Sequence, residues 1–203
     1  MASDKRNAGA ARPVRFKNPM VLMVNLVLVS IVILFIGITY GYLAKLGSSW
    51  LVFRLPKIFW LSTLSILLVS FLLQRLMAAY DADHAHEMKI RLGLAFGAAM
   101  LFSVCQVIGW QELIAQGLMM QAHPSVAYLY ILTGLHIAHV AVGLIFFIVA
   151  AFRLQKNTAT KVSALLYFAD PLRRDRLKLL VHYWHTIDFV WVMLFLSFLY
   201  NHT

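Results

Sequence analysis

Long apolar stretches alternate with short polar ones along the whole chain. Residues 18–44 carry no charged side chain, and this run exceeds the roughly 20 residues that a helix needs to cross a bilayer. Four further apolar stretches follow, near residues 56–79, 90–111, 125–152 and 179–200. The pattern predicts an all-α membrane helix bundle, with five transmembrane helices in a single domain over residues 19–203.

The first stretch is predicted to be a retained helix rather than a signal peptide. It is longer than the apolar region of a secretory signal, and no small-residue cleavage site follows 7–15 apolar residues. Pro19, Pro56 and Pro124 fall at predicted helix starts, where the missing backbone N–H costs nothing. No proline lies inside a predicted span, so we expect continuous helices rather than the broken helices of many transporters.

Basic residues are distributed unevenly between the two sides of the predicted bundle. Residues 1–18 form a basic N-terminal arm with five Lys or Arg, the second connection holds three, and residues 153–178 hold seven. Only three of the 18 basic residues fall in the remaining connections. Because cytoplasmic loops carry the excess of Lys and Arg, the N-terminus is predicted to be cytoplasmic and the C-terminus outside.

Composition narrows the function classes further. Hydrophobic residues make up 62% of the chain and charged residues 13%, against about 45–50% and 25% in soluble domains. The net charge of +10 is therefore interpreted as a topology signal rather than a nucleic-acid-binding surface. A single cysteine, Cys105, excludes an internal disulfide and a thiolate metal cluster. Phosphate-binding loops, HExxH and GxSxG motifs are absent from the sequence, so we expect the chain to catalyse no reaction by itself.

The polar residues inside the last two spans are the candidate functional residues. Ionisable groups within a membrane are costly and usually functional. His136 and His139 are three residues apart and share a helix face, with His136 about 15 Å deep, near the bilayer centre. His185 and Asp188 form a second stripe of the same spacing. A buried Asp188 needs a partner, and we expect His185 or a histidine of the preceding span to supply it.

These histidines allow two interpretations. In one, they ligate haem, and the chain is a membrane-anchored b-type cytochrome. His136 and His139, however, lie on one helix face and cannot bind opposite faces of the same haem. In the other, they form hydrogen bonds within the bundle or face lipid.

Two C-terminal motifs resemble a known family. Residues 134–143 read Gly-x-His-x-x-His-Val-x-x-Gly, and residues 183–191 read Tyr-Trp-His-x-x-Asp-x-x-Trp. Weaker matches are Leu55-Pro56, Ser62-Thr63, Gln106 and Trp110. In order and spacing, these motifs resemble subunit III of the haem–copper respiratory oxidases, in the five-helix form that lacks the first two helices of longer members.

The resemblance implies a non-redox accessory subunit of a proton-pumping cytochrome c or quinol oxidase in a bacterial cytoplasmic membrane. Such a subunit packs on catalytic subunit I, which holds the haems and copper, and binds phospholipid rather than a cofactor of its own. It supports proton uptake and protects the catalytic centre during turnover. The implied lipid-cleft or helix-packing residues are His136, His139, Gly143, Trp184, His185, Asp188 and Trp191, and the outer-end polar residues are Gln106, Trp110 and Glu112.

The chain also departs from this family pattern at two places. Its first span has no carboxylate, whereas family members commonly hold one there. Gly109 occupies a position where a Glu often precedes the outer-end aromatic residue, although Glu112 lies close in sequence.

Overall fold

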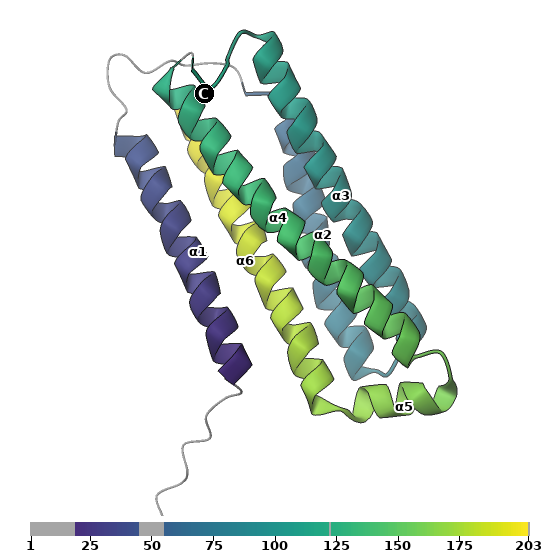
Figure 1. Cartoon of the computed structure of the whole chain (residues 1–203). Coiled ribbons are helices and arrows are strands. Elements are labelled where there is room, and N and C mark those ends of the chain that lie inside the picture. The colour runs from purple at the N-terminus through teal and green to yellow at the C-terminus, as the bar shows by residue number, and fades with distance from the viewer. Residues whose placement is uncertain (1–18, 45–54, 122, 203) are drawn as a thin grey trace, which may run out of the picture.

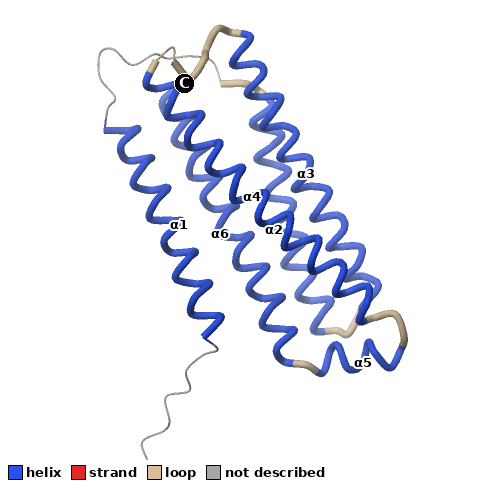
Figure 2. Tube along the Cα trace, in the orientation of Figure 1, coloured by secondary structure: helices blue, strands red, loops and turns tan. Residues whose placement is uncertain are grey.

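A computed structural model describes residues 19–44, 55–121 and 123–202, and these residues form helices joined by short turns (Figures 1 and 2). The predicted N-terminal arm, residues 1–18, lies outside them. The described helices are α1 (Pro19–Ala44), α2 (Ile58–Asp81), α3 (Ala85–Ala115), α4 (Pro124–Asn157), α5 (Lys161–Ala169) and α6 (Pro171–His202).

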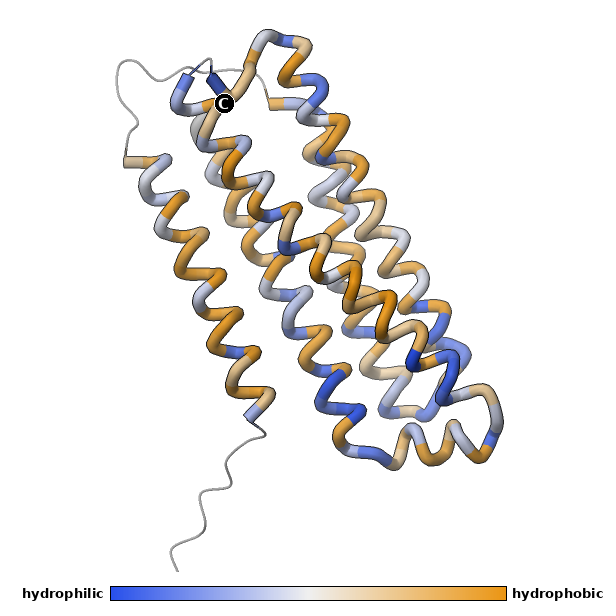
Figure 3. Tube along the Cα trace, viewed as in Figure 1, coloured by the Kyte–Doolittle hydropathy of each residue, from blue (hydrophilic) through white to orange (hydrophobic). Residues whose placement is uncertain are grey.

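Five of these helices, α1 to α4 and α6, are long and apolar enough to cross a membrane. They run side by side as one elongated bundle, and α5 lies across the end where α4 and α6 are joined (Figure 1). Apolar residues dominate the length of the bundle, and hydrophilic residues gather toward the α5 end (Figure 3). The predicted all-α bundle with five membrane spans is confirmed.

Helix α6 is the element that the others pack around. Helices α2 and α3 form a long antiparallel pair, and α6 contacts α2, α4 and α1. Helix α1 packs against α4 and α6 and buries only a narrow face, including Phe35 and Tyr42. Many of the other apolar side chains of α1 are exposed, as expected for a helix whose outer surface contacts lipid or another membrane protein.

The basic segment 153–178 is more ordered than its charge suggested. We expected a cytoplasmic loop, but α4 continues to Asn157, α5 follows, and α6 already begins at Pro171. Local capping explains the difference. Thr160 and Ser163 form a reciprocal capping box at the start of α5. The Asp170 side chain accepts from the Leu172 backbone N–H at 3.0 Å, directly before Pro171, and so caps α6.

Candidate functional site

A buried polar seam runs along α6, formed by Trp184, His185, Asp188 and Trp191 with the groups they contact on α2 and α4. The indole Nε1 of Trp191 donates to Thr63 Oγ1 at 3.0 Å, and Thr63 in turn donates to the Phe59 carbonyl. His185 Nδ1 lies 2.6 Å from the Ser70 hydroxyl. Two turns of α2 are therefore tied to two turns of α6 by hydrogen bonds inside the membrane span.

Two polar groups are exceptions within the seam: the Trp184 indole Nε1, which has no hydrogen-bond partner among the described residues, and the carboxylate of Asp188. Asp188 is 4% exposed, and neither carboxylate oxygen has a hydrogen-bond partner among the described residues. The Ser70 hydroxyl lies near it, but the close hydrogen bond of Ser70 is to His185. The expected pairing of Asp188 with a histidine is thus wrong for the hydrogen bonds of this structure. The i to i+3 spacing placed His185 and Asp188 on the same side of α6, but the His185 ring bonds to Ser70 of α2 instead of Asp188.

His136 lies at the centre of the bundle, where four helices meet. It is fully buried, and its ring centroid is 5.2 Å from that of Trp191, 5.5 Å from Phe102 and 6.2 Å from Phe35. Neither ring nitrogen has a hydrogen-bond partner in the described part of the chain. Aromatic rings from α1, α3 and α6 therefore hold this histidine in place by packing.

Two other residues of the α4 motif, His139 and Gly143, lie where α4 packs closely against α6. The backbone carbonyl of His139 accepts a 2.7 Å hydrogen bond from the Tyr183 hydroxyl, which joins α4 to α6. A Cβ added to Gly143 would lie 2.7 Å from Trp184 Cζ2. Trp184 also stacks on Phe147, with centroids 4.6 Å apart. Gly143 is therefore the place where the backbone of α4 approaches the Trp184 indole.

The outer-end polar residues belong to a different part of the bundle, between α2, α3 and α4. Gln106 is buried and donates to the Ser62 hydroxyl at 3.0 Å, and Trp110 Nε1 donates to Thr133 Oγ1 at 3.0 Å. Glu112 is exposed and joins neither contact. At Gly109 an added Cβ would overlap the ring of Phe59, so a side chain does not fit at this position.

The histidines of this arrangement are surrounded mainly by packing contacts. Among residues 19–44, 55–121 and 123–202, no three His, Cys, Asp or Glu side chains gather as a metal site. Haem ligation needs an imidazole open to a flat macrocycle. The rings around His136 fill that space, and His185 Nδ1 lies at hydrogen-bonding distance from Ser70. These contacts weigh against the b-type cytochrome interpretation.

Sequence comparison finds a similar protein. No family model matches the chain. A cytochrome c oxidase subunit 3 from Corynebacterium diphtheriae is 27% identical over 138 residues. The chain is similar to an oxidase subunit. The alignment covers 66% of this chain and 62% of the relative, so it spans less than two thirds of that protein. The similarity agrees with the family that the two C-terminal motifs resemble.

Sequence reasoning missed most of the partners on α2. Ser62, Thr63, Ser65 and Ser70 all form hydrogen bonds to other helices, through Gln106, Trp191, the Ala98 carbonyl and His185 respectively. Serine and threonine have intermediate hydropathy, so they do not stand out within an apolar span. Their clustering within one apolar span was the available signal, because such residues often bond across helices in membranes.

Proposed function

We propose that this chain is a non-redox accessory subunit of a haem–copper terminal oxidase. The observation that carries the proposal is the similarity to cytochrome c oxidase subunit 3 over 138 residues. The buried polar seam supports it, because its indole, imidazole and hydroxyl groups are used to join helices. Electron transfer and oxygen reduction then belong to catalytic subunit I, on which this chain packs in a bacterial cytoplasmic membrane.

The apolar outer surface of the bundle also supports the proposal that the chain is part of a larger membrane complex. Large apolar side chains are exposed along α1 and α2, including Met23 at 67% and Leu64 at 66%. Such surfaces are covered by lipid or by apolar faces of other subunits. In the proposed role, phospholipid and subunit I share them, and the chain supports proton uptake and the stability of the catalytic subunit during turnover.

The proposal is tested by isolating the chain together with its natural partners. An affinity tag at the C-terminus, followed by mild-detergent extraction of native membranes, should recover a haem- and copper-containing subunit in about equal amount. The same preparation should consume oxygen. Recovery of the chain with no haem–copper subunit, from membranes that contain an active oxidase, would sink the proposal.

A spectrum of the chain produced alone separates the proposal from the b-type cytochrome. The reduced-minus-oxidised difference spectrum should contain no haem b band in stoichiometric amount. A band that disappears with His136→Ala would establish the cytochrome instead.

A further inference from the structure

Helix α6 has one open side. It packs against α1, α2 and α4, and α1 also packs against α4, whereas α1 and α2 are not packed against each other in the described part of the chain. The side of α6 between α1 and α2 is therefore left uncovered (Figure 1). Exposed or partly exposed side chains follow one face of α6 at steps of three or four residues and are called the open stripe: His182, His185, Phe189, Met193, Leu196 and Tyr200.

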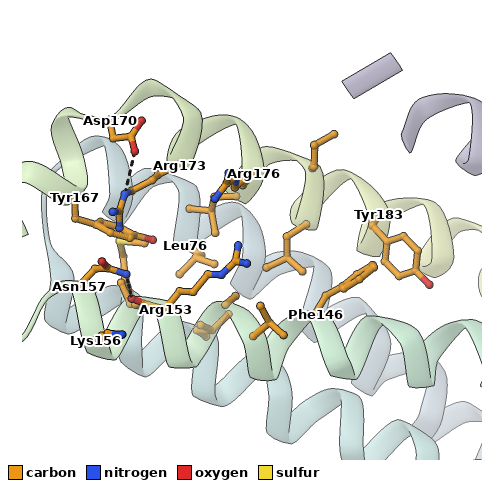
Figure 4. Close-up of a pocket in the computed structure, with 18 of the residues that line it drawn as sticks. Leu76, Phe146, Arg153, Lys156, Asn157, Tyr167, Asp170, Arg173, Arg176 and Tyr183 are labelled. Carbon is orange, nitrogen blue, oxygen red and sulfur yellow. Dashed lines mark hydrogen bonds and ion pairs between the residues drawn. The ribbon is translucent and has the colours of Figure 1, made fainter. Parts of the chain in front are cut away.

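The open stripe is sharply bounded, because the rest of α6 forms the core of the bundle. Ile187 and Val190 are fully buried, whereas Phe189 between them is 59% exposed. The open stripe is also distinct from a cavity of about 750 Å³ at the α5 end, which α6 lines with Arg176 and Tyr183 (Figure 4). None of the residues of the open stripe lines that cavity. The cavity and the open stripe therefore use different sides of α6.

One imidazole of the open stripe has a nitrogen that the bundle does not satisfy. His185 Nδ1 lies 2.6 Å from the Ser70 hydroxyl, and no described residue forms a hydrogen bond with Nε2 of the same ring. If Ser70 donates to Nδ1, then Nε2 carries the proton and needs an acceptor. If Nδ1 donates to Ser70, then Nε2 needs a donor. In either neutral tautomer, the partly exposed His185 ring requires a second polar group from outside the described bundle.

The depth of His185 decides what can supply that group. His185 lies seven residues beyond Lys178, the last cation of α6, and so about 10 Å deeper along the helix. The headgroup layer on one side of a bilayer is about 5–7 Å thick, which places His185 beside hydrocarbon. Acyl chains form no hydrogen bonds, and ionisable groups within a span pair with other protein groups or line a water-filled cavity. A polar side chain on a neighbouring transmembrane helix meets the requirement.

We propose that the open stripe binds a transmembrane helix of another subunit, whose hydroxyl or amide side chain forms a hydrogen bond with His185 Nε2. Hydroxyl and amide groups both donate and accept, so they serve either tautomer. From His182 to Tyr200 the open stripe runs 18 residues, or about 27 Å, which is close to the hydrocarbon thickness of a bilayer. Phe189 and Leu196 supply the apolar packing. The inference deepens the proposed function, because it names the surface through which the chain joins a complex.

Photo-cross-linking in native membranes tests the open stripe. Benzoylphenylalanine replaces Phe189 in the tagged full chain, and in the matched control it replaces Leu94 of α3, which is 57% exposed and lies outside the open stripe. Mass spectrometry then identifies the cross-linked peptides. The probe at position 189 should link to a transmembrane segment of one other subunit, in clear excess over position 94. Links to lipid alone, to a second copy of the chain alone, or to the same protein with equal yield from both positions would overturn the proposal.

Matched substitutions test the hydrogen bond of His185. His185→Leu removes Nε2 together with the bond to Ser70, whereas Ser70→Ala removes only the bond inside the bundle. Retention of the cross-linked subunit on the tagged chain in detergent should fall about 3- to 18-fold in His185→Leu, as for one interhelical hydrogen bond. It should change little in Ser70→Ala, and His185→Gln should restore part of it. Equal falls in His185→Leu and Ser70→Ala, or no fall in His185→Leu, would overturn the proposal.

The identity of the cross-linked subunit separates this inference from the proposed function. A transmembrane segment of a haem–copper oxidase subunit would support both. A transmembrane segment of a protein that belongs to no oxidase would support the open stripe as an interface and contradict the proposed function. Recovery of an oxidase with the tagged chain, while the probe at position 189 links only to lipid, would support the proposed function and overturn the inference. Circular dichroism of each variant establishes that it is folded, and the probe at position 189 keeps the test independent of substitutions at His185.

Discussion

Gly143→Ala should destabilise the bundle through one defined overlap. The new Cβ would lie 2.7 Å from Trp184 Cζ2, 3.0 Å from Trp184 Cε2 and 3.1 Å from Tyr183 Cε1. Trp184 cannot move away easily, because it is fully buried and stacked on Phe147. Overpacking of this kind typically costs about 1–3 kcal/mol. It also opposes the gain of up to about 1 kcal/mol that alanine has over glycine within a helix.

Gly134→Ala on the same helix is the matched control. A Cβ at Gly134 meets no atom within 4 Å, so this variant reports the helix-propensity gain alone. Thermal unfolding in detergent, followed by circular dichroism, should place Gly143→Ala below the unsubstituted chain and Gly134→Ala at or above it. The free energy of unfolding of Gly143→Ala should be about 1–3 kcal/mol lower than that of Gly134→Ala.

Trp184→Phe decides whether the overlap is the cause. Phenylalanine lacks the larger indole system that carries the clashing Cζ2 and Cε2 atoms, so it should recover part of the stability lost in Gly143→Ala. In the unsubstituted background, the same change should only remove packing and cost stability. If the two substitutions add, with no coupling between them, the close approach of α4 to Trp184 is not what limits this position.

Three further substitutions test other contacts by the same unfolding measurement. Gly109→Ala should be destabilising, because its Cβ overlaps the Phe59 ring, and Phe59→Leu in the same chain should restore part of the loss. Thr63→Val removes the acceptor of the Trp191 indole N–H. The free energy of unfolding should fall by about 0.6–1.7 kcal/mol, as for other interhelical hydrogen bonds in membranes. No change would mean that packing alone holds this pair. Asp188→Asn should leave stability unchanged or raised, since the carboxylate has no hydrogen bond among the described residues to lose, and a large loss would reveal a partner.

The five spans follow from the sequence because membrane crossing is set by length and charge. A charge-free run is sufficient to predict a helix such as α1, and Pro19 and Pro124 mark helix starts. The same criterion misplaced the start of α6, because residues 171–178 are too charged to count as membrane-spanning. The local signal there was Asp170-Pro171, an N-cap residue followed by proline at the first helical position.

The seam was only partly predictable because spacing fixes a helix face but not its neighbour. The stripe on α6 divides in the structure: Trp184 packs toward Gly143 of α4, whereas His185 and Trp191 point to Ser70 and Thr63 of α2. Which helix faces which residue depends on the packing of all five spans. A pattern along one helix does not show that packing, so the spacing could not reveal that Asp188 has no hydrogen-bond partner among the described residues.

The most direct test of the proposed function is to recover the tagged chain from native membranes and measure haem and copper in the purified assembly. An accessory oxidase subunit predicts a haem–copper catalytic subunit in about equal amount, together with oxygen consumption by the preparation. Recovery of the folded chain without haem or copper, while oxidase activity stays in the unbound fraction, would contradict that assignment.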